Sequence, residues 1–419
     1  MTDVSTSARL PAAAAVPAAD AARRRLSIGF LNLAHALDHF VILIYPMVVI
    51  ELELAYGRSY SELIALSTAS FIAFGLFSLP AGWLADRWSR RNMMAAFYIG
   101  CGLSLVGAAA APSLWVLALA LFSLGVFAAI YHPVGTAMVV EQATQRGRTL
   151  AFNGVCGNLG VALAAGTTAV LTAALSWRGA FLVPGLVCIA VGALYLRLIP
   201  DEPRQKAARS SAPDVALSAA AAAAIFGLFV MVALCAGLVF NTLSVALPKI
   251  VDERVSRDIS LLAVGGLTTA VFLCGALAQL TVGRLVERIK PHILFAACAV
   301  LQFSGVVWVA YARGAPLLFA LAFTMAAIYA QITVNDLIIA RYTADAWRGR
   351  VYAVRYFLTF MISGAAVSMI AVLYGRGGFG LVLGVTAVVA AGFLVAVVLI
   401  ALIANGVEKT RVPQPVPAE

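Results

Sequence analysis

Long apolar segments, separated by short polar stretches, recur along the whole chain of 419 residues. Each is about 20 residues or longer, the length that an α-helix needs to cross the hydrocarbon core of a bilayer. The short alternating segments of a transmembrane β-barrel do not appear in the sequence. The pattern therefore predicts an all-α membrane protein with about twelve transmembrane helices, at residues 28–50, 61–84, 92–111, 114–140, 149–173, 177–199, 222–249, 260–284, 292–312, 315–340, 347–373 and 379–404.

The composition agrees with this fold class. Hydrophobic residues make up 63% of the chain and charged residues 11%, whereas a soluble domain is about half apolar and about one quarter charged. All six cysteines lie in apolar segments and none forms a CxxC pair, so packing explains them better than disulfides or a metal cluster. We expect the lipid bilayer as a partner and no cofactor.

The net charge of +10 is explained by a difference between the two sides of the membrane. If the N-terminus is cytoplasmic, most of the 29 Lys and Arg residues fall in cytoplasmic segments, such as 23–25, 87–91 and 197–209. This asymmetry follows the positive-inside rule. It predicts a multi-pass protein of a bacterial-type inner membrane with both termini in the cytoplasm. No nucleic-acid partner is expected, and we expect a monomer.

Polar segments predict the domain boundaries. Residues 1–27 are Ala/Pro-rich and are expected to form a disordered cytoplasmic tail, and residues 200–221 resemble a cytoplasmic linker at the middle of the chain. These segments leave an N-terminal six-helix half at 28–199, a C-terminal six-helix half at 222–404, and a cytoplasmic C-terminal tail at 405–419.

Short sequence matches relate the two halves. The segment GWLADRWSRR follows the second predicted span, and GRLVERIK follows the eighth. The residues that correspond at a constant offset are Gly82 with Gly283, Asp86 with Glu287, and Arg87 with Arg288. The segments RGRTLAF and RGRVYAV form a second match at nearly the same offset. Two six-helix halves in one orientation are the parallel repeat that alternating-access transporters use.

The first of these segments contains the pattern Gly-x-x-x-Asp-Arg-x-x-Arg-Arg, formed by Gly82, Asp86, Arg87, Arg90 and Arg91. With this pattern and the twelve-span layout, the chain resembles the major facilitator superfamily over essentially its whole membrane region. Within the superfamily, the segments HALDHFVILIYP, YHPVGTA and NGVCGNLG resemble exporters of the fosmidomycin-resistance type. At the positions that Asp38 and His39 occupy in this chain, that group carries Asn-Asp.

The resemblance implies a fold of two halves around a central cavity. It also implies proton-coupled export of a small organic molecule, drug-like or weakly anionic, by alternating access. The loop pattern would act as a gate, because Asp86 would face the start of the eleventh span and, with nearby arginines, hold the cytoplasmic side shut. The second-half copy of the pattern, with Gly283, Glu287 and Arg288, would hold the cytoplasmic side shut more weakly.

The most informative polar residues lie inside apolar spans. His35, Asp38 and His39 are three and four residues apart in the first span and therefore share one helical face. His132 lies in the fourth span at a similar depth. Ionisable groups within a membrane are costly and normally face a protein interior or a wet cavity. We predict that these four residues carry the coupling protons; the alternative is that they hydrogen-bond between helices and fix the packing.

Two other functions remain open. Imidazoles and a carboxylate on one helical face are also suitable ligands for a transition metal, so His35, Asp38, His39 and His132 could instead serve a transporter of a metal or metal chelate. A transporter-like receptor or assembly factor is the alternative of another class. No P-loop, nucleophile elbow or dinucleotide motif occurs in a suitable context, so we do not expect an enzyme.

Other polar residues in the spans are candidates for binding the transported molecule. Their mixture of amides, tyrosines and one arginine is suited to an amphipathic or weakly anionic compound. The candidate substrate-binding residues are Asn32, Tyr45, Tyr131, Asn153, Asn158, Asn241, Gln279, Gln331, Asn335 and Arg355.

Overall fold

The computed structural model describes residues 18–201, 219–256, 258–285, 288–342 and 345–409, and every regular element in these ranges is a helix. The N-terminal half contains α1 (Ala18–Tyr56), α2 (Tyr60–Ala65), α3 (Thr68–Leu76), α4 (Ser78–Arg87), α5 (Arg90–Ala110), α6 (Leu114–Ala128), the π-helix η1 (Tyr131–Gly135), α7 (Thr136–Gln142), α8 (Arg146–Ala174) and α9 (Trp177–Leu198). The C-terminal half contains α10 (Ala219–Arg254), α11 (Leu261–Leu285), α12 (Pro291–Tyr311), α13 (Ala315–Tyr342) and α14 (Asp345–Lys409).

The all-α membrane fold is confirmed. Ten helices in the described ranges are long and apolar enough to span a membrane, and the bent pair Tyr60–Leu76 and Ser78–Arg87 provides an eleventh span. The last candidate, Phe357–Gly406, has non-helical backbone at Gly377 and Gly378 and is therefore two helices joined at a kink. This arrangement accommodates the twelve predicted spans. Large apolar side chains such as Trp115 and Phe319 are exposed on the outside, as lipid contact requires.

Helices extend past three of the predicted tail and linker boundaries. α1 begins at Ala18, so residues 18–27 of the predicted disordered tail are helical, because alanines are the best helix formers and Asp20 stabilises the first turn. α10 likewise begins in an alanine run, at Ala219 instead of residue 222, and α14 continues to Lys409, past residue 404. Residues 1–17, 202–218 and 410–419, which include most of the predicted linker, lie outside the described residues.

The second predicted span is not one continuous helix. It is divided into α2, α3 and α4, with a bend of 40° at Phe77. Pro80 cannot donate a backbone hydrogen bond to the residues before the bend, and the Ser78 hydroxyl donates to the Gly75 carbonyl at 2.7 Å. A Cβ atom at Gly75 would lie 2.8 Å from the backbone nitrogen of Met361 in α14. The break therefore lies close to a tight contact between the two halves.

The fourth predicted span is also interrupted. Between α6 and α7 the chain forms the π-helix η1, which contains Pro133. Proline has no amide hydrogen and clashes with the preceding turn, and a wider turn of this kind is frequent at functional sites.

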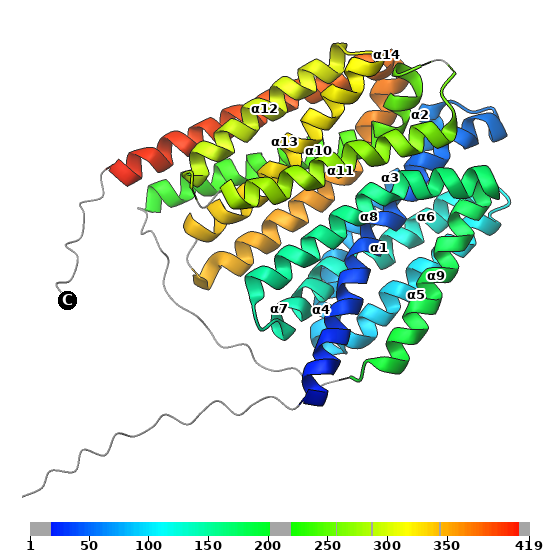
Figure 1. The fold of residues 1–419 in the computed structure, drawn as a ribbon, viewed down its shortest axis with the longest axis horizontal. Coiled ribbons are helices and arrows are strands. Elements are labelled where there is room, and N and C mark those ends of the chain that lie inside the picture. Colours follow the sequence, from blue (N-terminus) through cyan, green and yellow to red (C-terminus); the bar gives the residue numbers. More distant parts are fainter. Residues whose placement is uncertain (1–17, 202–218, 257, 286–287, 343–344, 410–419) are drawn as a thin grey trace, which may run out of the picture.

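The two halves contact each other at one end of the bundle and diverge toward the other (Figure 1). We call the end with the α4–α5 junction, Trp88–Ser89, the motif end, and the opposite end, with Gly57–Ser59, the distal end. α8 packs against α11, α2 and α3 pack against α14, and α1 contacts α10. At the motif end, the ends of α10, α12 and α14 point away from those of α4, α7 and α9 (Figure 1).

Candidate functional site

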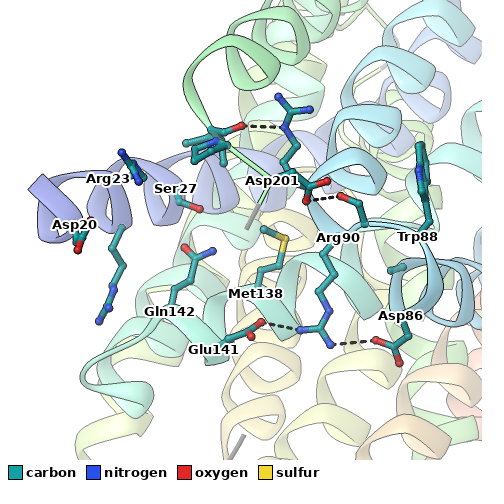
Figure 2. A pocket seen from close by; sticks show the side chains of 16 residues that line it. Asp20, Arg23, Ser27, Asp86, Trp88, Arg90, Met138, Glu141, Gln142 and Asp201 are labelled. Atoms are coloured by element: carbon teal, nitrogen blue, oxygen red, sulfur yellow. Dashed lines mark hydrogen bonds and ion pairs between the residues drawn. The ribbon is translucent and has the colours of Figure 1, made fainter. Parts of the chain in front are cut away.

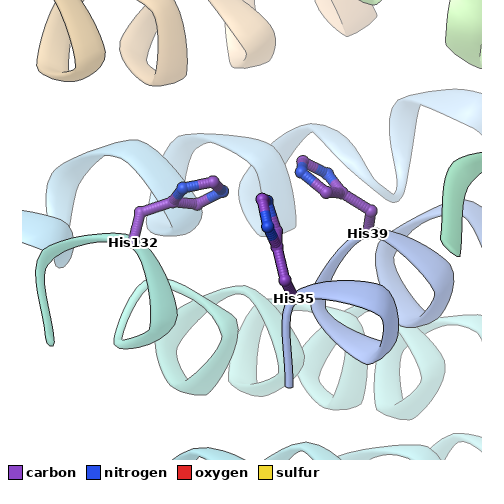
Figure 3. A group of neighbouring side chains, drawn as sticks. All are labelled: His35, His39 and His132. Atoms are coloured by element: carbon purple, nitrogen blue, oxygen red, sulfur yellow. The ribbon is translucent and has the colours of Figure 1, made fainter. Parts of the chain in front are cut away.

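Three histidines from two helices converge in the N-terminal half (Figure 3). His35 and His39 lie one turn apart on α1, and His132 lies on η1. One ring nitrogen from each lies within 4.8 Å of the others. The ring centroids of His35 and His39 are each 5.4 Å from that of His132. All three side chains are partly exposed.

Asp38 completes this group from the same face of α1. It is fully buried, and its Oδ2 lies 3.3 Å from Nε2 of His132. Among the described residues, neither carboxylate oxygen of Asp38 has a hydrogen bond. A buried carboxylate with a single imidazole beside it depends strongly on the charge of that imidazole, because little else compensates its desolvation.

Asn153 of α8 orients the histidine group from behind. Both oxygens of Asn153 accept from Nδ1 of His35, the carbonyl at 2.8 Å and Oδ1 at 3.0 Å. The Tyr131 hydroxyl donates to the same Oδ1 at 3.0 Å, and the Asn153 amide donates to Oδ1 of Asn32 at 3.0 Å. Because both partners of Nδ1 are acceptors, the proton of neutral His35 lies on Nδ1, which directs the lone pair of Nε2 toward the other histidines.

Aromatic side chains enclose His132. The ring of Phe360, from α14 in the other half, lies 4.6 Å from the His132 ring, and Phe74 of α3 contacts both. The His35 ring stacks on Tyr131 at 4.8 Å. The sequence analysis did not identify Phe74 or Phe360, because nothing in the spacing separates them from the other phenylalanines of the chain.

The predicted substrate-binding residues fall into several groups. Asn32, Tyr131 and Asn153 contact the histidine group directly, as described above. Asn158 donates to Gln279 and so joins α8 to α11 between the halves. Gln331 and Asn335 are buried on α13, and neither side-chain oxygen has a hydrogen-bond partner among the described residues. Such buried acceptors are available to a bound molecule.

Two other candidates, Tyr45 and Asn241, form hydrogen bonds outside the histidine group. The Tyr45 hydroxyl donates to the Leu63 carbonyl at 2.6 Å and joins α1 to α2 near the distal end. Asn241 donates to Gly237 of its own helix at 2.8 Å. Arg355 is partly buried on α14. The structure thus brings together only some of the predicted binding residues.

Three residues of the loop pattern, Asp86, Arg90 and Arg91, line a separate cavity of about 640 Å³ at the motif end (Figure 2). Arg90 lies 3.2 Å from Asp86 and 2.8 Å from Glu141 of α7. Arg91 donates to the Ile199 carbonyl at 2.9 Å, and Ser89 donates to Asp201 at 2.8 Å. The pattern therefore ties α4, α5, α7 and the end of α9 together within the N-terminal half. The N-terminal turns of α1 form another wall of this cavity.

Other residues of the two patterns have simpler surroundings. Arg87 stacks on Trp83, with its guanidinium carbon 4.0 Å from the ring centroid. A Cβ atom at Gly82 would lie 3.3 Å from Pro133, whereas one at Gly283 would meet no atom within 4 Å. Arg288 follows α11, and Glu287 lies outside the described residues. The side chains of residues 346–354 also lie outside them, so the predicted contact of Asp86 with the start of the eleventh span stays a prediction.

A group of charged and aromatic residues joins the halves at the distal end. Lys249 of α10 lies 2.5 Å from Glu53 of α1 and 2.8 Å from Asp252. Tyr60 of α2 contacts the Tyr374 ring of α14 at 4.8 Å. Nothing in the spacing of residues along the chain indicates that Lys249 and Glu53 meet.

Comparison with known proteins agrees with the fold. A family model of the Major Facilitator Superfamily matches residues 28–254, more than half of the chain. The structure resembles a bacterial homologue of the human lysosomal transporter Spinster, with a TM-score of 0.73 and 13% identity over 94% of this chain and 99% of that one. It also resembles the Escherichia coli fucose:proton symporter, with a TM-score of 0.60 and 14% identity over 90% of this chain and 98% of that one.

Curated relatives match over shorter segments. The puromycin resistance protein of Streptomyces alboniger is 32% identical over 162 residues, which are 38% of this chain and 32% of that protein. A probable L-galactonate transporter of Escherichia coli is 26% identical over 140 residues, which are 32% of this chain and 31% of that protein. The matches span about a third of the length of these relatives. Given the helical fold, its match to solved transporters and the family model, this chain belongs to the Major Facilitator Superfamily.

Proposed function

We propose that this multi-pass transporter exports a small organic molecule in exchange for protons by alternating access. The observation that carries the proposal is the contact of Asp38 with His132, because it places a fully buried carboxylate 3.3 Å from an imidazole on another helix. Intramembrane ionisable residues are rare and are associated with proton relays and substrate pathways.

The geometry supports a proton-exchange step between α1 and η1. When Asp38 is ionised and His132 is protonated, the two attract each other at this short distance. Loss of the His132 proton, or protonation of Asp38, removes that attraction and changes how tightly α1 holds η1. His35 and His39, which are adjacent, offer further positions for the proton. Phe360 contacts His132 from the other half. A change in the charge or orientation of this imidazole would therefore alter the packing between the halves.

The contacts between the halves support one of the two states that alternating access requires. The halves are joined at the distal end by Glu53 and Lys249 and diverge toward the motif end (Figure 1). With the orientation predicted from the basic residues, the distal end is periplasmic and the structure represents an inward-open state. In that state the histidine group would receive the substrate from the cytoplasm.

The relatives support a small polar or amphipathic substrate. One relative confers puromycin resistance and another is a probable transporter of L-galactonate, a carboxylate. In this chain, the buried oxygens of Gln331 and Asn335 would accept hydrogen bonds from such a molecule, and Arg355 would attract a negative charge. We propose a drug-like or weakly anionic compound on this basis.

The proposal is tested in proteoliposomes with an imposed pH gradient, using puromycin and a panel of organic carboxylates as substrates. Asp38→Asn should abolish transport driven by the gradient and retain exchange of labelled for unlabelled substrate, because exchange needs no net proton movement. Glu51→Gln, on the same helix and outside the histidine group, is the matched control and should transport normally. Transport by Asp38→Asn at the normal rate under the pH gradient would contradict the proposal.

A further inference from the structure

We infer that His35, His39 and His132 form a binding site for a divalent transition-metal ion, with the Asp38 carboxylate beside His132 as a charge partner. The inference uses the same group of residues as the proposed function, but it does not depend on proton coupling. It assigns a ligand class, Zn²⁺, Co²⁺ or Ni²⁺, to a group to which the proposed function gives protons only.

The spacing of the ligand atoms is close to that of a tetrahedral metal site. Zinc binds imidazole nitrogens at about 2.0–2.1 Å, so neighbouring ligand atoms of a tetrahedral site lie about 3.4 Å apart. Oδ2 of Asp38 and Nε2 of His132 already lie 3.3 Å apart. The three histidine nitrogens lie within 4.8 Å of one another. A bound ion would draw these nitrogens closer together through rotation of the imidazoles about their side-chain bonds.

The group also has the supporting hydrogen bonds of a metal site. A metal-binding histidine usually donates its second ring N–H to a carbonyl or carboxylate, which fixes the ring and its tautomer. His35 does this through Nδ1, which donates to the Asn153 carbonyl at 2.8 Å. A Cβ atom at Gly157 would lie 2.5 Å from Nε2 of His35, so the missing side chain at this position leaves room for the ring.

The donor set selects the class of ion. Three imidazoles favour zinc, cobalt, nickel or copper, whereas magnesium and calcium prefer oxygen ligands. The His35 and His39 side chains are partly exposed, whereas Nε2 of His132 is buried, so a bound ion would be enclosed on the His132 side. The Asp38 carboxylate balances half of the charge of a divalent ion.

A consequence is competition between the metal and protons. An imidazole or carboxylate binds a metal only in its deprotonated form, so metal binding releases protons and weakens as the pH falls. A bound ion would also fix α1 to η1. We therefore expect divalent transition metals to inhibit proton-coupled transport.

The test uses the detergent-purified full-length protein after removal of any affinity tag and of bound metal with EDTA. Titration with Co²⁺ should produce the visible absorption of a tetrahedral cobalt site, saturating at one ion per protein, and Zn²⁺ should displace the Co²⁺ whereas Mg²⁺ should not. The double variant with His39→Ala and His132→Ala should bind at least 100-fold more weakly. His292→Ala, which removes the fourth histidine of the chain from α12, should bind as the unchanged protein does.

Thermal unfolding in EDTA separates loss of binding from loss of folding. If the alanine double variant unfolds early, the variant with His39→Gln and His132→Gln, which keeps polar side chains of similar size, takes its place. Saturable cobalt binding that these variants remove supports the inference. Absence of saturable binding in the unchanged protein, or equal binding in the folded double variant, overturns it. Transport is measured separately in EDTA, so failure of metal binding and failure of proton coupling are distinguished.

Discussion

Glu53, at the end of α1, lies 2.5 Å from Lys249, at the end of α10, and this ion pair joins the two halves at the distal end. Lys249 is only 8% exposed and also contacts Asp252 and Glu253. Three carboxylates thus share one ammonium group in a largely buried place. Removal of the cation would leave like charges close together, which is far more costly than loss of an exposed ion pair.

We predict that Lys249→Met separates the halves at the distal end. Repulsion among the carboxylates should favour the state open at this end. A cysteine at Ser61, which faces Gly375 of α14 in this interface, should then react several-fold faster with a polar maleimide. The parent protein without the cysteine at residue 61 gives the background from its native cysteines.

The charge exchange Glu53→Lys with Lys249→Glu is the control for this prediction. It restores opposite charges across the interface and should return the labelling rate toward that of the unchanged pair. If Lys249→Met leaves the rate at residue 61 unchanged, the ion pair does not hold the halves together.

Asn153 is the residue that positions His35, Tyr131 and Asn32 relative to one another. Asn153→Ala removes four side-chain hydrogen bonds, each worth about 0.6 kcal/mol in membrane proteins, so the free energy of unfolding should fall by about 2 kcal/mol. The His35 ring also loses one of its two acceptors, and the pH profile of transport should change. Asn158→Ala, on the same helix, should lower stability without changing that profile. An unaltered profile in Asn153→Ala would limit this residue to a structural role.

Close packing of α8 against α1 depends on Gly160. A Cβ atom at this position would lie 2.0 Å from the Ala36 carbonyl oxygen, which is backbone and cannot move aside. Gly160→Val should therefore lower the free energy of unfolding by about 1–3 kcal/mol, as overpacking does. Gly154, on the same helix, has no atom within 4 Å of its Cβ position. Gly154→Ala should therefore be neutral or stabilising by up to about 1 kcal/mol. Unfolding curves in a detergent series give the free energy of unfolding of the two variants. Equal values for Gly160→Val and Gly154→Ala would contradict the packing argument.

Phe360 should control access to His132 from the other half. Phe360→Ala removes the ring that lies 4.6 Å from the imidazole. The rate at which diethylpyrocarbonate modifies His132, followed by mass spectrometry, should increase several-fold. Phe319→Ala, which alters an exposed ring on the outer surface, should have no effect on that rate. A rate at His132 that does not respond to Phe360→Ala would show that other groups cover the imidazole.

Much of the fold was predictable because span length depends on the thickness of the bilayer and is visible in the apolar segments. The shared face of His35, Asp38 and His39 also followed from helical spacing. The approach of His132 was expected from its depth, and the structure shows the contact. The role of these residues in proton coupling remains a prediction.

Other features depend on tertiary packing, which the spacing of residues does not contain. Phe360 contacts His132 across two helices that are far apart in sequence, and Glu53 meets Lys249 in the same way. The positions of Pro80 and Pro133 do not specify where α3 ends or that η1 is a π-helix. The helical start of α1 was missed because the same alanine and proline residues are typical of disordered tails.

The π-helix η1 sets the direction in which the side chains of the following helix, α7, point. One residue inserted in or deleted from an α-helix turns all later side chains by about 100°. The wider turn of Tyr131–Gly135 absorbs a surplus residue, so that His132 faces α1 while Glu141, further along, still faces Arg90. A chain one residue shorter here would keep every chemical group and yet turn Glu141 away from the loop pattern. The length of this segment therefore allows His132 to face the histidine group while Glu141 faces Arg90 of the loop pattern.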